Sequence, residues 1–208
     1  MRISGPIALA VLLLTSPVVA KPAVPLVPFG IPFLPESPKP VAPSHPLYQR
    51  IALNPIVGMP DKIGAFLIPI TNLKEFEEAL RETLAQANML APPGQPAQAH
   101  LTVRWITLDA PTKISFSSNA TSSISYVLTR SDNGQQIFAR DISTSTKSTG
   151  GDGADRLKGN ARLAILSNLA SAVVCLDKAA LGLAPSDCAL TPQASYRAAR
   201  MTYIFVPR

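Results

Sequence analysis

The sequence predicts an α+β domain in which two helices pack on one face of a mainly antiparallel sheet, in the order β-α-β-β-β-α. Three observations predict it: two long segments with helical periodicity, three intervening segments that alternate apolar and polar residues, and the hairpin signal Asn133-Gly134. The chain has 208 residues, of which 47% are hydrophobic and 15% charged, so we expect one domain with a core of ordinary size.

The first strand is expected at residues 51–57, and a turn at 58–61 ends it. Pro55 has no backbone donor, which restricts this strand to an edge or a bulge of the sheet. A short apolar run at 66–70 then leads into the first helix.

The first helix is expected at residues 72–87. Asn72 is a suitable N-cap and Glu75 follows three residues later, which is close to a capping box. Apolar residues recur on one helix face, and Glu77 with Arg81 forms an i,i+4 pair on the opposite side. The carboxylates of this helix are expected to form a solvated ridge: Glu75, Glu78 and Glu82.

Three strands follow, at residues 101–105, 123–130 and 136–144. Their apolar residues recur at every second position, which is typical of strands with one buried face. Asn133-Gly134 joins the last two strands, because both residues tolerate the positive φ angles of a type I′ turn. We therefore expect an antiparallel meander.

The second helix is expected at residues 154–178, after a glycine-rich break with Asp152 as its N-cap. Its apolar surface is broad, which predicts packing across the sheet beside the first helix. Gly182 and Pro185 end the helix, and residues 201–206 could add a C-terminal strand.

Residues 1–20 have the features of a secretory signal. Arg2 provides a positive start, residues 7–14 form an apolar run, and cleavage is expected after Ala20. The alternative is an uncleaved membrane anchor, but Pro17 interrupts a run shorter than the ~20 residues that span a bilayer. Residues 21–46 form a proline-rich linker that excludes helices and central strands, and residues 47–208 form the domain. We expect a periplasmic or secreted protein.

Two cysteines remain after this cleavage, Cys175 and Cys188. In an oxidising compartment they could form a disulfide that closes a loop of about 14 residues and contributes on the order of 3 kcal/mol. The alternative is two separate thiols. No pair among these cysteines, His45 and His100 has zinc-ligand spacing, so we expect neither a metal nor another cofactor.

Catalytic motifs are sparse. His100, Asp109 and the serines of 115–125 could be combined into a hydrolase triad, but no Gly-x-Ser-x-Gly elbow places a nucleophile. We interpret His100 as an ordinary strand residue. The break at 150–153 lacks the Gly-Lys-Ser/Thr ending of a phosphate-binding loop. The formal charge of +6 comes from scattered residues, so it is a weak indication of anionic lipid or polysaccharide partners.

The chain also resembles a group of known proteins. The segments FEEAL at 76–80, SYVL at 125–128 and RLAILSNL at 162–169, in helix-meander-helix order, resemble small Gram-negative envelope proteins. These are the transport-auxiliary and lipopolysaccharide-assembly lipoproteins, whose domain is similar to the TolB N-terminal domain. The resemblance covers roughly residues 50–178. This chain departs from the pattern because it has no lipid-attachment cysteine, and it adds a proline-rich leader and a cysteine-bearing tail.

The resemblance implies a non-enzymatic periplasmic accessory protein that binds a protein partner or an envelope lipid, in envelope transport or assembly. Such a protein would be peripheral to the membrane and would not bind nucleic acid. The alternatives are a secreted hydrolase or acyltransferase that acts on cell-wall or lipid substrates, and a structural spacer. No residue role is transferred by the resemblance.

Overall fold

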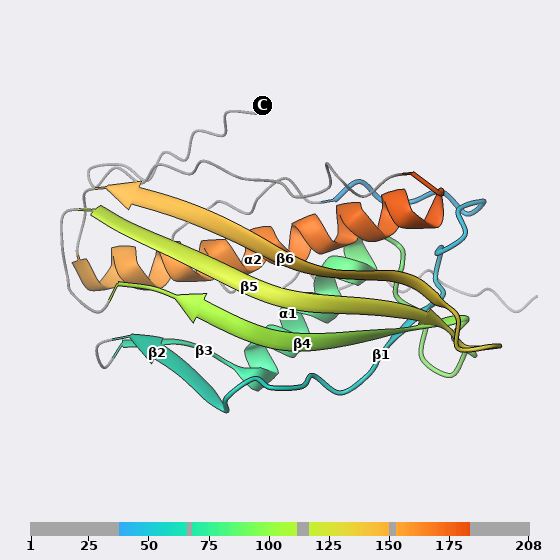
Figure 1. Cartoon of the computed structure of the whole chain (residues 1–208), viewed down its shortest axis with the longest axis horizontal. Coiled ribbons are helices and arrows are strands. Elements are labelled where there is room, and N and C mark those ends of the chain that lie inside the picture. Colours follow the sequence, from blue (N-terminus) through green and yellow to red (C-terminus); the bar gives the residue numbers. More distant parts are fainter. Residues whose placement is uncertain (1–37, 66–67, 112–116, 150–152, 184–208) are drawn as a thin grey trace, which may run out of the picture.

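The computed structural model describes residues 38–65, 68–111, 117–149 and 153–183, and it confirms the α+β class (Figure 1). The predictions for Ala20, Asp152, Cys188 and a C-terminal strand concern residues outside these ranges. The described elements are β1 (Ile51–Leu53), β2 (Lys62–Ala65), β3 (Ile68–Asn72), α1 (Leu73–Gln86), β4 (Ala99–Asp109), β5 (Ser117–Arg130), β6 (Gln136–Thr149) and α2 (Gly153–Ala180).

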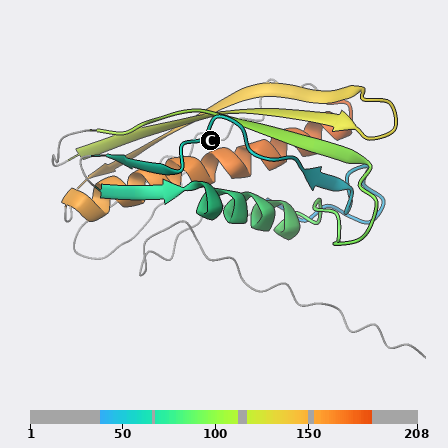
Figure 2. The same cartoon turned by 90° about the horizontal axis from the view of Figure 1, so that it is seen from below.

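The main sheet has the strand order β1-β4-β5-β6. Strands β4, β5 and β6 form the predicted antiparallel meander, and the short β1 pairs in parallel with β4 at the edge. Beyond β1 the chain still follows β4, because Val57 N donates to Val103 O at 3.0 Å and Trp105 N donates to Val57 O at 2.9 Å. Both helices lie on the same side of the sheet (Figure 2).

A second, two-stranded sheet adds strands before the first helix to the predicted order of elements. β2 and β3 pair antiparallel, and β3 coincides with the apolar run that was expected to precede the first helix. A Cβ atom on Gly64 would lie 2.8 Å from Ile68 O, so the close approach of the two strands requires glycine there. The inner residues of β3, Ile70 and Thr71, are buried.

The turn between β5 and β6 differs from the predicted type I′ turn. Gly134 has a φ of 70°, whereas Asn133 is not among the described residues with positive φ. A longer loop forms instead, in which Arg130 N donates to Gln135 O at 2.9 Å. The Asn133 side chain supports this loop by accepting from Gln135 N at 2.8 Å, a local bond that a short polar side chain makes readily.

Helix α1 begins as the sequence predicts. Asn72 Oδ1 accepts a hydrogen bond of 2.9 Å from Glu75 N and thereby satisfies one free donor of the first turn. Arg81 and Glu77 form the expected i,i+4 ion pair at 2.8 Å. The helix buries one apolar face, made by Phe76, Ala79, Leu80 and Leu84. Phe76 meets the ring of Trp105 from β4 edge-on, with centroids 5.4 Å apart.

Helix α2 is buried along almost its whole length. By length and composition it could cross a membrane, but 72% of its most apolar window is buried inside the domain, as in the core helix of a soluble protein. It packs against β5 and β6, and it also contacts β3 and α1. The helix is therefore the central element of the core.

Two asparagines of α2 make the polar part of this packing. Asn168 Nδ2 donates to Ser122 O at 2.9 Å and to Ile142 O at 2.7 Å, which joins α2 to the backbones of β5 and β6. Asn160 lies eight residues earlier, and its Nδ2 donates to Ser118 O at 2.9 Å and Thr146 O at 3.2 Å. The two side chains fix the position of α2 along the sheet, because buried polar groups must find their partners.

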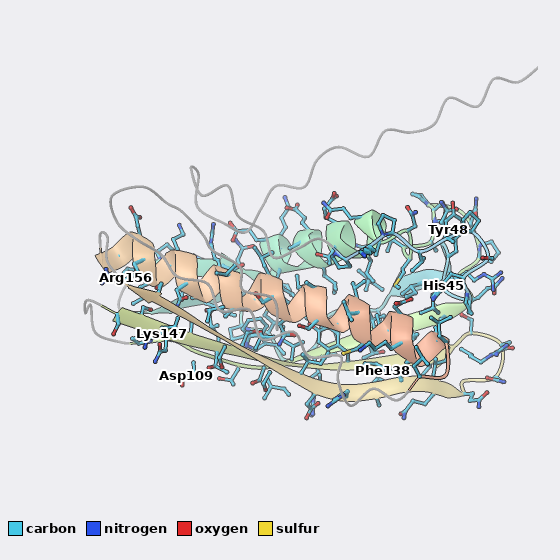
Figure 3. The ribbon with its side chains drawn as sticks, turned by 90° about the horizontal axis from the view of Figure 1, so that it is seen from above. His45, Tyr48, Asp109, Phe138, Lys147 and Arg156 are labelled. Carbon is cyan, nitrogen blue, oxygen red and sulfur yellow. The ribbon has the colours of Figure 1, made fainter. Side chains whose placement is uncertain are left out.

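Part of the predicted linker lies against the domain. Val41 is buried, its N donates to Ala87 O at 3.0 Å, and its O accepts from Asn88 Nδ2 at 3.4 Å. His45 Nε2 lies 3.0 Å from Asp177 Oδ1 near the end of α2, and Figure 3 shows His45 at that end of the molecule. Residues 38–46 are thus attached to both helices, whereas residues 21–37 lie outside the described part.

Candidate functional site

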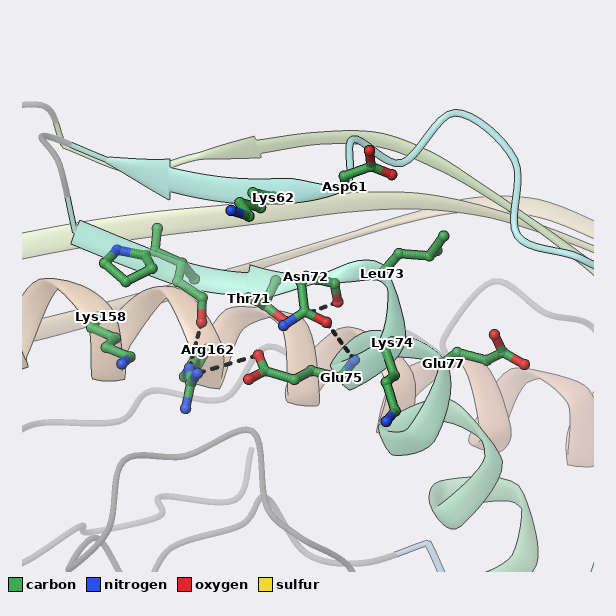
Figure 4. Close-up of a pocket in the computed structure, with 12 residues that line it drawn as sticks. Asp61, Lys62, Thr71, Asn72, Leu73, Lys74, Glu75, Glu77, Lys158 and Arg162 are labelled. Atoms are coloured by element: carbon green, nitrogen blue, oxygen red, sulfur yellow. Dashed lines mark hydrogen bonds and ion pairs between the residues drawn. The ribbon is translucent and has the colours of Figure 1, made fainter.

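A cleft of about 710 Å³ lies where β2 and β3 meet the start of α1 and the first half of α2 (Figure 4). Its volume is in the range of small-molecule sites in proteins. Three separate segments line it, and the second runs from β3 directly into α1: Asp61 and Lys62; Pro69, Ile70, Thr71, Asn72, Leu73, Lys74, Glu75 and Glu77; and Lys158 and Arg162.

Arg162 is the most buried charged group of the cleft, with 12% of its side chain exposed. Its Nε donates to Ile70 O in the middle of β3, and one terminal nitrogen lies 3.4 Å from Glu75 Oε2 on α1. Burial lowers the pKa of Arg162, and the Coulomb attraction of Glu75 opposes that shift. An arginine keeps its charge despite such a shift. Arg162 therefore connects three elements and holds a fixed positive charge at the base of the cleft.

Glu75 does not belong to the solvated ridge in which the sequence placed it. Its carboxylate turns to Arg162 on the neighbouring helix, although 42% of the side chain is still exposed. Glu78 stays on the outer side of α1, 3.9 Å from Lys74, and Glu82 accepts from Gln86 at 3.1 Å. The ridge prediction is therefore correct for two of its three members.

The lining carries more free positive charge than free negative charge. Glu75 is engaged by Arg162, and Glu77 by Arg81, which does not line the cleft. Lys62 from β2 and Lys158 from α2 have no ion pair or side-chain hydrogen bond within the part of the chain that the structure describes. Of the three lining carboxylates, Asp61 alone is not engaged by an arginine. This arrangement favours an anionic ligand.

The hydrolase constellation is not assembled. His100 pairs with Thr129 near one end of the β4–β5 ladder, whereas Asp109 pairs with Thr121 at the other. Nine residues of extended strand separate them, which corresponds to roughly 30 Å. Neither residue lines the cleft. This agrees with the interpretation of His100 as an ordinary strand residue.

The outer face of the sheet is polar and rich in hydroxyl groups. Cross-strand pairs connect Thr121 to Ser145 at 2.8 Å and Ser123 to Ser143 at 2.7 Å. Their hydroxyls bond to one another, so this face is a solvated surface in the described residues.

The remaining predicted site residues are placed only in part. Cys175 is buried in α2 and Cys188 lies outside the described residues, so the disulfide stays a prediction. No group of three or more His, Cys, Asp or Glu side chains suited to a metal ion occurs among the described residues. Lys62, Lys158 and Arg162 could not be identified from the sequence, because they come together only through the packing of α2 against β3, with which β2 pairs.

Comparison with known proteins shows a shared fold and no family. No family model matches the chain, and no curated protein matches it significantly. The fold is similar to the crystal structure of a Xanthomonas campestris protein assigned to the family DUF330, with a TM-score of 0.53, 11% identity, and coverage of 72% of this chain and 96% of that one. A hypothetical protein from Chlamydia trachomatis aligns with a TM-score of 0.48 and 11% identity, over 64% of this chain and 97% of that one. The lipoprotein and TolB-type resemblance expected from the sequence stays a prediction.

Proposed function

We propose that this protein is a non-enzymatic accessory protein of the Gram-negative envelope that binds a protein partner or an envelope lipid and acts in envelope transport or assembly. The observation that carries the proposal is the cleft, whose cations come from three different elements and whose lining, among the described residues, holds no histidine or cysteine. Protonated lysine and arginine side chains attract anionic groups and hydrogen-bond to them, which is the chemistry of a binding site. The protein works in the periplasm, behind a cleaved signal of residues 1–20.

One feature supports this proposal against a hydrolase or acyltransferase. The candidate triad residues His100 and Asp109 lie at opposite ends of β4, so they cannot act on one substrate atom. The fold is that of the Xanthomonas protein over 72% of the chain, and a fold alone assigns no activity. The binding role therefore rests on the cleft and the export signal, and not on the fold.

The test is affinity capture from the native envelope. A C-terminally tagged chain, expressed from its own promoter, is released by osmotic shock, crosslinked and purified, and the bound proteins and lipids are identified by mass spectrometry. We expect recovery in the periplasmic fraction, an N-terminus at Lys21, and one reproducible envelope partner or lipid. A cytoplasmic location would contradict the proposal. Turnover of an envelope substrate that is lost in His100→Ala would also contradict it and would support the enzyme instead.

A further inference from the structure

We propose that the cleft binds a phosphate group, held by Lys62 of β2 together with Lys158 and Arg162 of α2. The inference rests on the proposed function, because it names the ligand class of the same binding protein. Its chemistry is that of a phosphate monoester or diester, whether in a lipid headgroup or in a soluble metabolite.

The two lysines are available to a ligand. Lys158 and Arg162 are four residues apart on α2, so their side chains leave the same face of the helix, one turn from each other. Figure 4 shows both extending to the same side of α2. Neither Lys158 nor Lys62 is neutralised within the described residues, whereas Lys74 at the rim is 3.9 Å from Glu78 and largely exposed. An anion that enters the cleft would meet two uncompensated ammonium groups.

Arg162 is already positioned before any ligand arrives. Its Nε is bound to Ile70 O and its terminal nitrogen to Glu75, so little side-chain entropy remains to be lost on binding. Asn72 satisfies the N–H of Glu75, and the positive end of the α1 dipole faces the same region. A phosphate monoester with two negative charges is better matched to this set of cations than a phosphodiester or a carboxylate, each of which carries one.

The cleft is larger than a phosphate ion and partly apolar. Its volume of about 710 Å³ leaves space for an organic substituent, and Pro69 at the lining is exposed and Leu73 is partly buried. These residues can contact the carbon atoms next to a phosphate ester. Inorganic phosphate should therefore bind more weakly than a phosphate ester.

The test titrates the purified mature chain, residues 21–208, at fixed ionic strength. ¹H–¹⁵N NMR spectra are recorded with inorganic phosphate and with glycerol 3-phosphate, and co-sedimentation is measured with vesicles of phosphatidylglycerol or phosphatidylcholine. The double variant Lys62→Gln/Lys158→Gln removes the two free charges. Lys147→Gln is the matched control, because Lys147 is exposed on the outer face of the sheet, away from the cleft.

We expect amide shifts at residues 70–75 and 158–162, and a roughly tenfold or larger loss of affinity in the double variant but not in Lys147→Gln, since charge-assisted hydrogen bonds are lost. Binding of glycerol 3-phosphate identifies a soluble ester. Binding to phosphatidylglycerol vesicles alone, with the same variant dependence, identifies a lipid headgroup. The proposal is overturned if inorganic phosphate, glycerol 3-phosphate and phosphatidylglycerol vesicles all fail to bind, or if the double variant and Lys147→Gln weaken binding equally. Envelope capture that does not depend on the two lysines would then still support the proposed function.

Discussion

The phenol of Tyr126 donates a hydrogen bond of 2.7 Å to Asn168 Oδ1 in the interior of the domain. Asn168 in turn donates from its Nδ2 to the backbone oxygens of Ser122 and Ile142. One amide group thus uses its acceptor and both donors, and it connects α2 to a core side chain and to two strands. Asn160, which lies nearer the start of the helix, donates to one backbone oxygen on each of the same two strands. Its Oδ1 has no hydrogen-bond partner in the described structure.

This difference predicts that two alanine substitutions lower the free energy of unfolding by unequal amounts. Asn168→Ala leaves the Tyr126 hydroxyl and two strand carbonyls without their bonds, so we expect the free energy of unfolding to fall by about 2–4 kcal/mol. Asn160→Ala should cost less, about 1–2 kcal/mol. Urea denaturation of both variants measures the difference. Asn119→Ala, on the exposed face of β5, is the control and should change stability by less than about 0.5 kcal/mol. Equal losses at positions 160 and 168 would contradict the role assigned to the Tyr126–Asn168 bond.

The burial of Tyr126 predicts a loss of stability at alkaline pH. Burial raises the pKa of the Tyr126 phenol well above its ordinary value of 10.0. Below the unfolded pKa the phenol is protonated in both states and its contribution is complete. Above that value the unfolded state releases the proton first, so stability falls as pH rises toward the folded pKa, by up to about 1.4 kcal/mol per pH unit.

Tyr126→Phe tests this dependence. The variant should be less stable than the wild type at pH 8 by about 1 kcal/mol, because it lacks the bond to Asn168. Its stability should then decline less steeply between pH 10 and 11. The measurement is the urea midpoint of both proteins at several pH values. Parallel curves over the alkaline range would show that another group causes the decline.

The attached segment 38–46 predicts a sharp step in a truncation series. Removal of residues 21–37 should leave the unfolding free energy unchanged within about 0.5 kcal/mol if that stretch acts as a linker. Removal through Pro46 exposes the partners of Val41 and ends the His45–Asp177 contact, so we expect a loss of about 2–4 kcal/mol. Thermal and urea unfolding of both truncated proteins measure the step. A gradual decline would show that no distinct attachment begins near residue 38.

The two cysteines provide a redox prediction. If Cys175 and Cys188 are bonded, non-reducing peptide mapping should recover them as one linked species. Cys188→Ser should then lower stability by about 3 kcal/mol, and reduction of the wild type should have the same effect. Cys188 is the better position for this test, because replacement of the buried Cys175 would also alter the packing of α2. Two titratable thiols in the purified, unreduced protein would show separate cysteines.

Local signals explain what could be predicted of the fold. The N-cap Asn72 and the alternation in β4 to β6 depend on neighbouring residues, and both appear in the structure. β5 begins at Ser117, earlier than predicted, because the inward Ser118 and Ser122 are buried although their side chains are polar. β2 was not expected, because its four residues do not alternate and its place depends on pairing with β3.

The candidate site depends on contacts between distant residues, and this explains why sequence reasoning missed it. Arg162 and Glu75 are 87 residues apart. In the sequence, Arg162 is one of several charged residues in the first half of a largely apolar helix, and Glu75 is part of a helix start. Neither pattern indicates the other, so only the packing of α2 beside α1 and β3 brings the two side chains together.

The position of α2 in the chain affects how the domain assembles during synthesis. It is the last described element to leave the ribosome, yet it covers the inner face of β5 and β6. Until residues 153–180 emerge, a nascent chain exposes the strand side chains that this helix later buries: Ile124, Tyr126 and Leu128. The packing of α2 on β5 and β6 therefore forms last, and the preceding interval is the stage at which a chaperone would have an apolar surface to bind.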